Sequence, residues 1–407
     1  MSCGWIMVRC KCWGILIRFV INMSVNNRIF VAAWEYPPIM SGESTVCRRT
    51  LKYSKFSFDV CCGPVAIKGD DHIRLFPQQG SKYFKWPFRV LHCFRRLDKE
   101  EHYRIMMSRV MPPNGHLAGW LIKRIRPDIK WIVYFSDPIW NSPFLKFTLK
   151  KSNDHRPNWL LMKAFGIPAK WAVRESDLLV FNNQRLARYV LGGEFDKYKD
   201  KVVVAPYGHE GVCLPKSSNC YSEKFSLTHV GQIYGNRTFA DLLAGVELLQ
   251  QTAPELFAKL QIRQVGFVCQ SERKRIELSP AKQAFSLIDE VPYEYSLAEM
   301  YQADCLLVID PVFDCTEKNV YIPGKIYDYF STGKPIMCIA KADSATGDVA
   351  RKARLRWFVE PDGSAICTLL QRLILQRPRE VSRDTYELFS ARKGVSILDE
   401  RIEELMK

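Results

Sequence analysis

Residues 304–339, DCLLVIDPVFDCTEKNVYIPGKIYDYFSTGKPIMCI, contain the stretch that decides the fold. An apolar run over 304–309 predicts a strand, a helix is expected over 324–332, and a second apolar run over 335–339 predicts another strand. A helix between two strands is typical of a parallel crossover unit. Pro323 suits the first turn of that helix, where its missing N–H has no partner to lose.

The same alternation extends outward from this unit in both directions. Further strands are expected at 28–33, 58–62, 130–135, 177–181, 201–205, 225–230 and 262–268. Helices are expected at 88–109, 158–175, 238–250 and 296–302. Strands that alternate with helices predict an α/β fold with parallel sheets.

The chain is expected to form two successive Rossmann-like domains, because the alternation restarts after Pro206-Tyr207-Gly208. The first domain is assigned to 26–205 and the second to 206–380. A C-terminal helix within 381–407 is expected to pack back toward the first domain. Residues 1–25 are an N-terminal extension whose apolar part, interrupted by a charged residue, is too short for a spanning helix of about 20 residues.

The composition is that of a globular protein. The chain has 407 residues, of which 47% are hydrophobic and 25% charged. Its 14 Cys are scattered and form no CxxC pair, so they indicate a reduced, cytoplasmic protein without a zinc ribbon. HExxH and Asp-x-Asp are absent, and no metal is expected.

Positive charge is concentrated in the first half. Residues 1–200 hold 33 Lys/Arg against 16 Asp/Glu, whereas residues 201–407 hold 26 against 27. Basic and aromatic residues alternate over 82–109, which favours binding to an anionic membrane surface. The alternative is that these aromatic residues are core and the charges merely solvated. Nucleic acid is not expected as a partner, because no recognised binding module is present.

The segment 304–339 also carries candidate binding residues. Lys325 lies in the first turn of the expected helix, where the helix dipole attracts anions, and Asp328 lies one turn later. A cation at a helix N-terminus suits a diphosphate, and a nearby carboxylate suits a ribose diol. The alternative is a helix with a solvent-exposed ion pair.

Three other strand-to-loop junctions are candidates. Gly231 lets a ligand approach the backbone, and Arg237 can bind a phosphate with two hydrogen bonds, although both residue types are common in ordinary turns. Gly42 permits a tight approach at the start of a helix, and Ser44 and Thr45 are expected either to cap that helix or to touch a ligand. Asp137 follows a strand and is either a base or a turn cap.

Together these segments resemble the retaining family-four glycosyltransferases of the GT-B fold. IPGKIYDYFSTGKPI at 322–336 is similar to the donor-site helix of that family, and GQIYGNR at 231–237 to its Gly-Arg-x4-Lys element. YPPIMSGES and PYGHE resemble its N-terminal loop and its inter-domain element. The resemblance implies two Rossmann-like domains that face each other across a cleft.

The resemblance also implies roles for individual residues. Asp328 takes the place of a glutamate that holds the ribose, Arg237 that of a lysine on the diphosphate, and Gln232 that of an arginine. Val320, followed by Tyr321, stands where many members have a second acid, for which Glu317 is the nearest substitute. These departures leave a catalytically inactive scaffold protein as the alternative function.

The expected activity is that of a hexosyltransferase that moves a sugar, with retention of configuration, from a UDP- or GDP-linked donor. The acceptor is expected to be a lipid-linked or glycan intermediate of a surface polysaccharide, on the inner face of the cell membrane. No cofactor is expected. The predicted catalytic residues are Asp137, Arg237 and Lys325. The predicted donor-binding residues are Gly42, Gly231, Gln232, Arg237, Val320, Tyr321, Lys325 and Asp328.

Overall fold

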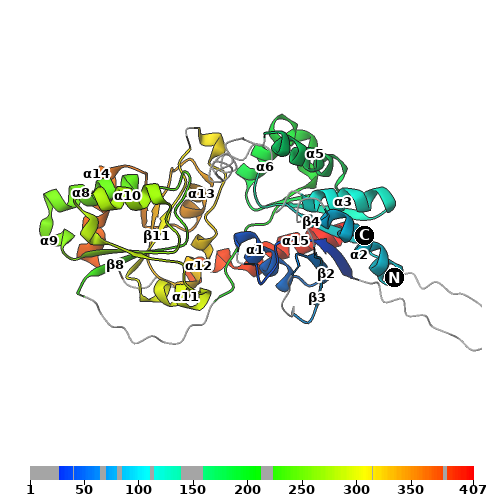
Figure 1. Cartoon of the computed structure of the whole chain (residues 1–407), viewed down its shortest axis with the longest axis horizontal. Coiled ribbons are helices and arrows are strands. Elements are labelled where there is room, and N and C mark those ends of the chain that lie inside the picture. The colour runs from blue at the N-terminus through cyan, green and yellow to red at the C-terminus, as the bar shows by residue number, and fades with distance from the viewer. Residues whose placement is uncertain are drawn as a thin grey trace, which may run out of the picture.

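The computed structural model has two domains, each built around one parallel sheet (Figure 1). It describes residues 27–39, 41–64, 70–79, 85–110, 114–138, 159–211, 223–313, 315–378 and 383–407. The N-terminal extension, 1–25, lies outside the described residues. The expected α/β architecture with parallel sheets is confirmed.

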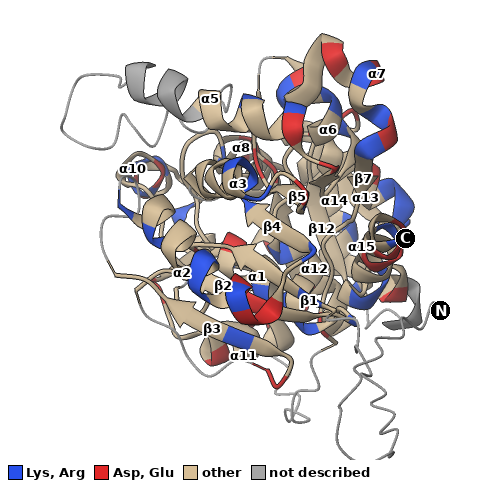
Figure 2. Ribbon diagram, turned by 90° about the vertical axis from the view of Figure 1, so that its right-hand side faces the viewer, with Lys and Arg blue, Asp and Glu red and all other residues tan. Residues whose placement is uncertain are grey.

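The first domain contains a seven-stranded sheet in the order β3-β2-β1-β4-β5-β6-β7, which Figure 2 views from the right-hand side of Figure 1. Its strands are β1 (Arg28–Ala32), β2 (Ser57–Cys62), β3 (Ile73–Pro77), β4 (Ile105–Arg109), β5 (Lys130–Phe135), β6 (Leu178–Phe181) and β7 (Val202–Val204). Its helices are α1 (Gly42–Lys52), α2 (Trp86–Glu101), α3 (Asn114–Ile125), α5 (Trp159–Glu175), α6 (Gln184–Leu191) and α7 (Phe195–Tyr198).

Alternation along each strand divides this sheet's core into two layers. Phe30 and Ala32 of β1 pack with α2, α3, α5 and α6 on one face. Ile29 and Val31 pack with α1 on the other face. Successive side chains of a strand point to opposite faces, and both faces of this sheet are covered, so β1 is apolar throughout its buried length.

One predicted helix was wrong at its C-terminal end. The helix expected over 88–109 is α2, which ends at Glu101, and residues 105–109 form β4. His102 ends the helix in a left-handed conformation, with φ 50°. Every residue of β4 is buried, and a strand buried on both faces lacks the alternation that distinguishes it from a helix.

The second domain contains a six-stranded sheet in the order β10-β9-β8-β11-β12-β13. Its strands are β8 (Phe225–Val230), β9 (Leu260–Val265), β10 (Phe285–Ile288), β11 (Cys305–Ile309), β12 (Ile336–Ile339) and β13 (Trp357–Val359). Its helices are α8 (Ala240–Thr252), α9 (Pro254–Phe257), α10 (Gln270–Leu278), α11 (Tyr293–Gln302), α12 (Lys325–Thr332), α13 (Ala345–Lys352) and α14 (Gly363–Gln376).

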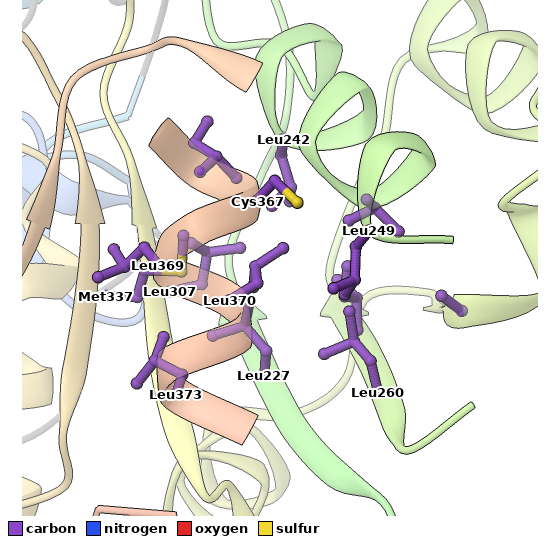
Figure 3. Packing of buried hydrophobic residues seen from close by; sticks show 14 of the residues in the cluster. Leu227, Leu242, Leu249, Leu260, Leu307, Met337, Cys367, Leu369, Leu370 and Leu373 are labelled. Atoms are coloured by element: carbon purple, nitrogen blue, oxygen red, sulfur yellow. The ribbon is translucent and has the colours of Figure 1, made fainter. Parts of the chain in front are cut away.

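A leucine-rich layer holds α8 and α14 against this sheet. Leu370 and Leu373 of α14 are fully buried and face Leu227 and Leu307 of the sheet (Figure 3). Burying a leucine side chain contributes about 1.5–3 kcal/mol, so this layer is a main source of stability for the domain. The opposite face is covered by α11, α12 and α13.

The last helix, α15 (Ala391–Met406), lies against the first domain (Figure 1). Leu398 and Ile402 complete the core beside α1. Asp399 accepts hydrogen bonds from Ser54 Oγ (2.6 Å) and the backbone N–H of Lys55 (2.9 Å). The chain therefore crosses from the second domain back to the first before it ends.

The carboxyl edges of the two sheets face each other. Asn183, which follows β6, donates to the carbonyl of Val320 (3.0 Å) in the loop after β11. Arg185 of α6 pairs with Asp343 (2.6 Å) and Asp348 (2.5 Å), which follow β12. Each of these segments follows the carboxyl end of a parallel strand, where open α/β sheets bind their ligands. None of the helices within the described residues is long and apolar enough to cross a membrane.

Candidate functional site

Gly231 marks the point where β8 ends. Its φ of +126° is one that residues with a side chain rarely adopt, and a Cβ there would lie 2.7 Å from Lys325 Nζ. The backbone N–H of Gly231 donates to the carbonyl of Val265 at 2.7 Å, which fixes the turn. Glycine is therefore required so that the lysine can approach the backbone.

Lys325 is the first residue of α12, and its ammonium end lies against β8. Its Nζ is 2.6 Å from His229 Nε2. Burial and the positive charge of Arg237 both lower the pKa of Lys325 well below its ordinary value. No carboxylate within the described ranges forms an ion pair with this lysine.

Arg237 lies beside the lysine, at the end of the loop that follows β8. Its Nε donates to the carbonyl of Ile309 (3.0 Å) and its Nη1 to that of Gln232 (3.4 Å). Burial lowers the pKa of Arg237, and the charge of Asp310 opposes this effect. Burial also raises the pKa of Asp310 to about 7, although Thr346 donates a hydrogen bond to it. Arg237 thus faces a carboxyl group whose pKa is raised to about 7.

Three predicted donor-binding side chains do not join this pair. Gln232 Nε2 donates to the exposed Glu290 (3.0 Å). Val320 packs into the core of the first domain. The ring of Tyr321 lies against Phe313, with centroids 5.8 Å apart. Val320 and Tyr321 therefore connect the domains and add no charge to the site.

Asp328, on α12, forms an ion pair with the first domain. Its Oδ1 is 2.5 Å from Arg49 Nη2 on α1. Burial raises the pKa of Asp328, and the charge of Arg49 acts in the opposite direction. Arg49 is also 3.6 Å from Glu210, which Lys52 contacts at 3.0 Å. The carboxylate predicted for a ribose is thus held by an arginine across the domain interface.

The first domain contributes a buried ion pair at its own strand ends. Arg109 Nε donates to Glu43 Oε1 at 2.5 Å, and Ser136 donates to the other oxygen of Glu43. The guanidinium of Arg109 stacks on Tyr134, 4.0 Å from the ring centroid. Its two terminal nitrogens have no hydrogen-bond partner among the described residues. The sequence placed Arg109 in the basic surface stretch, and that placement was wrong, because the residue is 1% exposed.

Asp137 follows β5 and is partly exposed. Burial, together with the charges of Glu43 and Glu35, raises the pKa of Asp137 to about 7. A carboxyl group with this pKa can give or take a proton near neutral pH. Its assignment as a catalytic residue stays a prediction.

Gly42 begins α1 as expected, but its surroundings are open. Nothing lies within 4 Å of a Cβ built on it. The helix is capped by Ser41, whose Oγ accepts from the N–H of Ser44 at 3.0 Å. The expectation that Ser44 or Thr45 caps this helix was therefore wrong.

The sequence did not single out His229, Glu43 or Arg49 as site residues. His229 is two residues before Gly231 on β8, so its side chain emerges beside the glycine turn, and this spacing was an available signal. Glu43 and Arg49 acquire their roles from partners 66 and 279 residues away. No local pattern identifies such pairs. Within the described residues, no cluster of three or more His, Cys, Asp or Glu side chains could hold a metal ion.

Comparison with solved structures identifies the fold. A lipopolysaccharide outer core galactosyltransferase, WaaB, matches with a TM-score of 0.58 and 12% identity over 93% of this chain and 99% of that chain. An E. coli trehalose-6-phosphate protein bound with UDP-2-fluoro glucose matches with a TM-score of 0.63 and 12% identity over the same shares. WaaG, a glycosyltransferase involved in lipopolysaccharide biosynthesis, matches with a TM-score of 0.56 and 10% identity over 93% and 99%.

The chain therefore has the GT-B fold of these glycosyltransferases, as the resemblance implied. No family model matches its sequence, and no curated protein does. At 10–12% identity the matches establish the architecture, and what the site does must be argued from its residues.

Proposed function

We propose that the protein is a glycosyltransferase that moves a sugar from a nucleoside-diphosphate donor to an acceptor. The observation that carries the proposal is the pair of basic side chains Lys325 and Arg237 beside Gly231, where the missing side chain lets the lysine approach the backbone. Anions bind well at a helix N-terminus with cationic side chains. The matching E. coli structure is bound with UDP-2-fluoro glucose. We therefore propose that the anion is the diphosphate of a nucleotide sugar.

The chemistry requires a site that stabilises the departing diphosphate. Arg237 and Lys325 supply positive charge where negative charge develops, which is the largest contribution in many enzymes. Asp137, on the opposing domain, is the group that can exchange a proton with the acceptor. Retention of configuration and the hexosyl nature of the transferred group are part of this proposal.

The acceptor is proposed to be lipid-linked, because α2 presents a basic face to solvent. Phe88 is 60% exposed on this face. The exposed cations of this segment are Lys85, Arg89, Arg95, Arg96 and Lys99. Trp86 and Phe94 are fully buried, so of the aromatic residues described in this stretch only Phe88 is available to a membrane. Residues 81–84 lie outside the described part.

Such a face favours peripheral association with an anionic leaflet, here taken as the cytoplasmic side. Each basic residue near the surface contributes about 1 kcal/mol. The protein is expected to sediment with anionic vesicles at low salt and to lose binding when Arg89, Arg96 and Lys99 are changed to Glu. Neutral vesicles are the control. Equal sedimentation of the triple variant and the wild type would contradict the proposed membrane association.

The donor site is tested by thermal stabilisation with UDP, GDP, ADP and CMP and their sugars. A ligand at 100 times its dissociation constant adds about 2.7 kcal/mol of stability. We expect one nucleotide to stabilise the wild type, and Arg237→Ala and Lys325→Ala each to reduce the shift. Lys274→Ala, on the exposed surface of α10, is the matched control and should behave as the wild type. A shift that survives both site variants would place the ligand elsewhere.

A second candidate is a catalytically inactive GT-B protein that acts as a scaffold in polysaccharide assembly. It is favoured by the ion pair of Asp328 with Arg49 and by the burial of Val320 where related enzymes often carry an acid. This candidate would be supported if the protein bound a nucleotide sugar but neither transferred the sugar nor slowly hydrolysed the donor. Turnover that depends on Asp137 would exclude it.

A further inference from the structure

A chain of three polar side chains from three elements leads to the candidate diphosphate site. It begins at Gln264 on β9, which is fully buried. Its Nε2 donates to the carbonyls of Gly231 (2.7 Å) and Gly266 (3.3 Å). Carbonyls only accept, so the amide orientation is fixed and Oε1 faces His229.

The fixed amide also sets the tautomer of His229. Oε1 of Gln264 is 2.5 Å from His229 Nδ1. An amide oxygen only accepts, so Nδ1 carries the proton and Nε2 presents a lone pair. Burial, with the charges of Lys325 and Arg237, lowers the pKa of His229 well below its ordinary value, so the ring stays neutral.

The lone pair of His229 Nε2 receives Lys325 Nζ at 2.6 Å. The same Nζ lies over the backbone of Gly231. A lysine side chain ordinarily has four flexible bonds, but here its end is fixed by contacts from β8 while its base is fixed on α12. His229 thus fixes the position of Lys325 Nζ.

The surroundings of Lys325 also set its charge. Arg237 from the loop before α8 is the charged group that acts on it. His229 from β8 is neutral, and Asp310 after β11 faces Arg237. Asp328, on α12 itself, pairs with Arg49. An anion bound beside Lys325 and Arg237 would supply the negative charge that this pocket of cations lacks.

We propose that His229, oriented by Gln264, is a positioning residue for Lys325, and that binding of a nucleoside diphosphate is accompanied by uptake of a proton at Lys325. The proton comes from solvent, converts the amine to the ammonium and leaves again when the diphosphate dissociates. The inference rests on the proposed function, because it names the ligand of the same site.

Proton uptake is measured by titration calorimetry of UDP and of GDP at one pH in buffers of different ionisation enthalpy. We expect the wild type to take up a substantial fraction of one proton per nucleotide bound. Lys325→Met should take up less, because it keeps the volume but cannot be protonated, and the same titration of Asp310→Asn separates any uptake by that carboxyl group. Between pH 7.5 and 8.5, above the second phosphate pKa of about 6 and below the ionisation of the bases, wild-type affinity should fall with pH while that of Lys325→Met stays constant.

Positioning is measured by replacing the acceptor nitrogen. His229→Phe keeps the ring but removes Nε2, and nucleotide affinity should fall about tenfold, as expected for one lost hydrogen bond to a charged group. His229→Gln should recover part of the loss. In the Lys325→Met background, His229→Phe should have no further effect, because it acts through the lysine. His72→Phe, the same change on a histidine that binds the carbonyl of Leu51, is the matched control.

The outcomes separate this inference from the function beneath it. If neither UDP nor GDP binds the wild type, both the proposed function and this inference fail. If a nucleotide binds with no proton taken up, or if His229→Phe binds as tightly as the wild type, the inference alone is overturned. The comparison of wild type with Lys325→Met does not depend on whether the His229 variants fold.

Discussion

Each domain holds an arginine near the carboxyl ends of its central strands, but the two arginines have different partners. Arg109 in the first domain is buried against the carboxylate of Glu43, 2.5 Å away. Arg237 in the second domain donates to two backbone carbonyls and has no carboxylate in an ion pair within the described residues. The first charge is neutralised inside the protein, and the second stays available to a ligand. On our proposal, Arg109 is structural and Arg237 binds the ligand.

The largest expected effect is on stability. Arg109→Leu should lower the free energy of unfolding by about 3–5 kcal/mol, because it leaves Glu43 buried without its partner. Arg237→Leu should cost less than about 1 kcal/mol, because it removes a charge that faces Lys325. Urea denaturation measures both. The double change Glu43→Leu with Arg109→Leu should recover much of the loss. Equal losses of stability for Arg109→Leu and Arg237→Leu would contradict the proposed difference between the two arginines.

The next effect compares two glycines, one from each domain. Gly231→Ala should cost about 1–3 kcal/mol for its backbone conformation and should also weaken nucleotide binding, because its Cβ would displace Lys325 Nζ. Gly42→Ala should leave both unchanged or slightly raise stability, since it begins a helix with open space around it. Thermal unfolding and nucleotide titration measure the pair. A Gly42→Ala variant that loses binding would show that α1 contacts the ligand.

A smaller effect concerns the pH dependence of stability. The folded pKa of Asp137 is about 7, above the ordinary carboxyl value of about 3.9, so between these pH values the folded state holds a proton that the unfolded state has lost. This contribution is fully present below about pH 4 and is lost as the pH rises toward 7.

Asp137→Asn should therefore be more stable than the wild type at pH 8 and little different at pH 4, which unfolding at both pH values measures. Asp310→Asn is the second-domain counterpart, because Asp310 also has a pKa of about 7. Both changes should remove pH dependence of the same sign. Only Asp137→Asn should abolish turnover. A variant less stable than the wild type at pH 8 would contradict the buried-carboxyl interpretation.

The smallest effect is expected at the exposed ion pairs between the domains. Arg185 is 30% exposed in its side chain, and its partner Asp343 is 65% exposed. Exposed pairs contribute about 0–1 kcal/mol, so Arg185→Ala should change the unfolding free energy by less than about 1 kcal/mol. A loss above 2 kcal/mol would mean that these contacts hold the domains together more strongly than their exposure indicates.

Much of the fold was predictable because its strands are short apolar runs bounded by turn residues. β5, expected at 130–135, is observed there, and β8 coincides with the expected 225–230. β10 and β13 were not predicted, since they are edge strands of four and three residues. β4 was assigned to a helix because burial on both faces removes its periodicity.

The candidate site was predictable where one segment carries the signal. Gly231 and Arg237 lie at the two ends of a single strand-to-helix loop. Lys325 begins a helix whose start is indicated by the preceding Pro323 and Gly324. The structure brings these three together. It does not bring the side chain of Gln232 or Gly42 to them, because the amide of Gln232 donates to Glu290 and Gly42 lies in the other domain.

By itself, the sequence determined the alternation of strands and helices and the cations at two loop ends, since both are local properties of short segments. Only the tertiary structure decided that Asp328 meets Arg49, that Glu43 neutralises Arg109, and that His229 receives Lys325. Each of these pairs joins residues far apart in the chain. The charge and protonation of a buried group depend on the neighbours that packing supplies, and a linear pattern does not contain them.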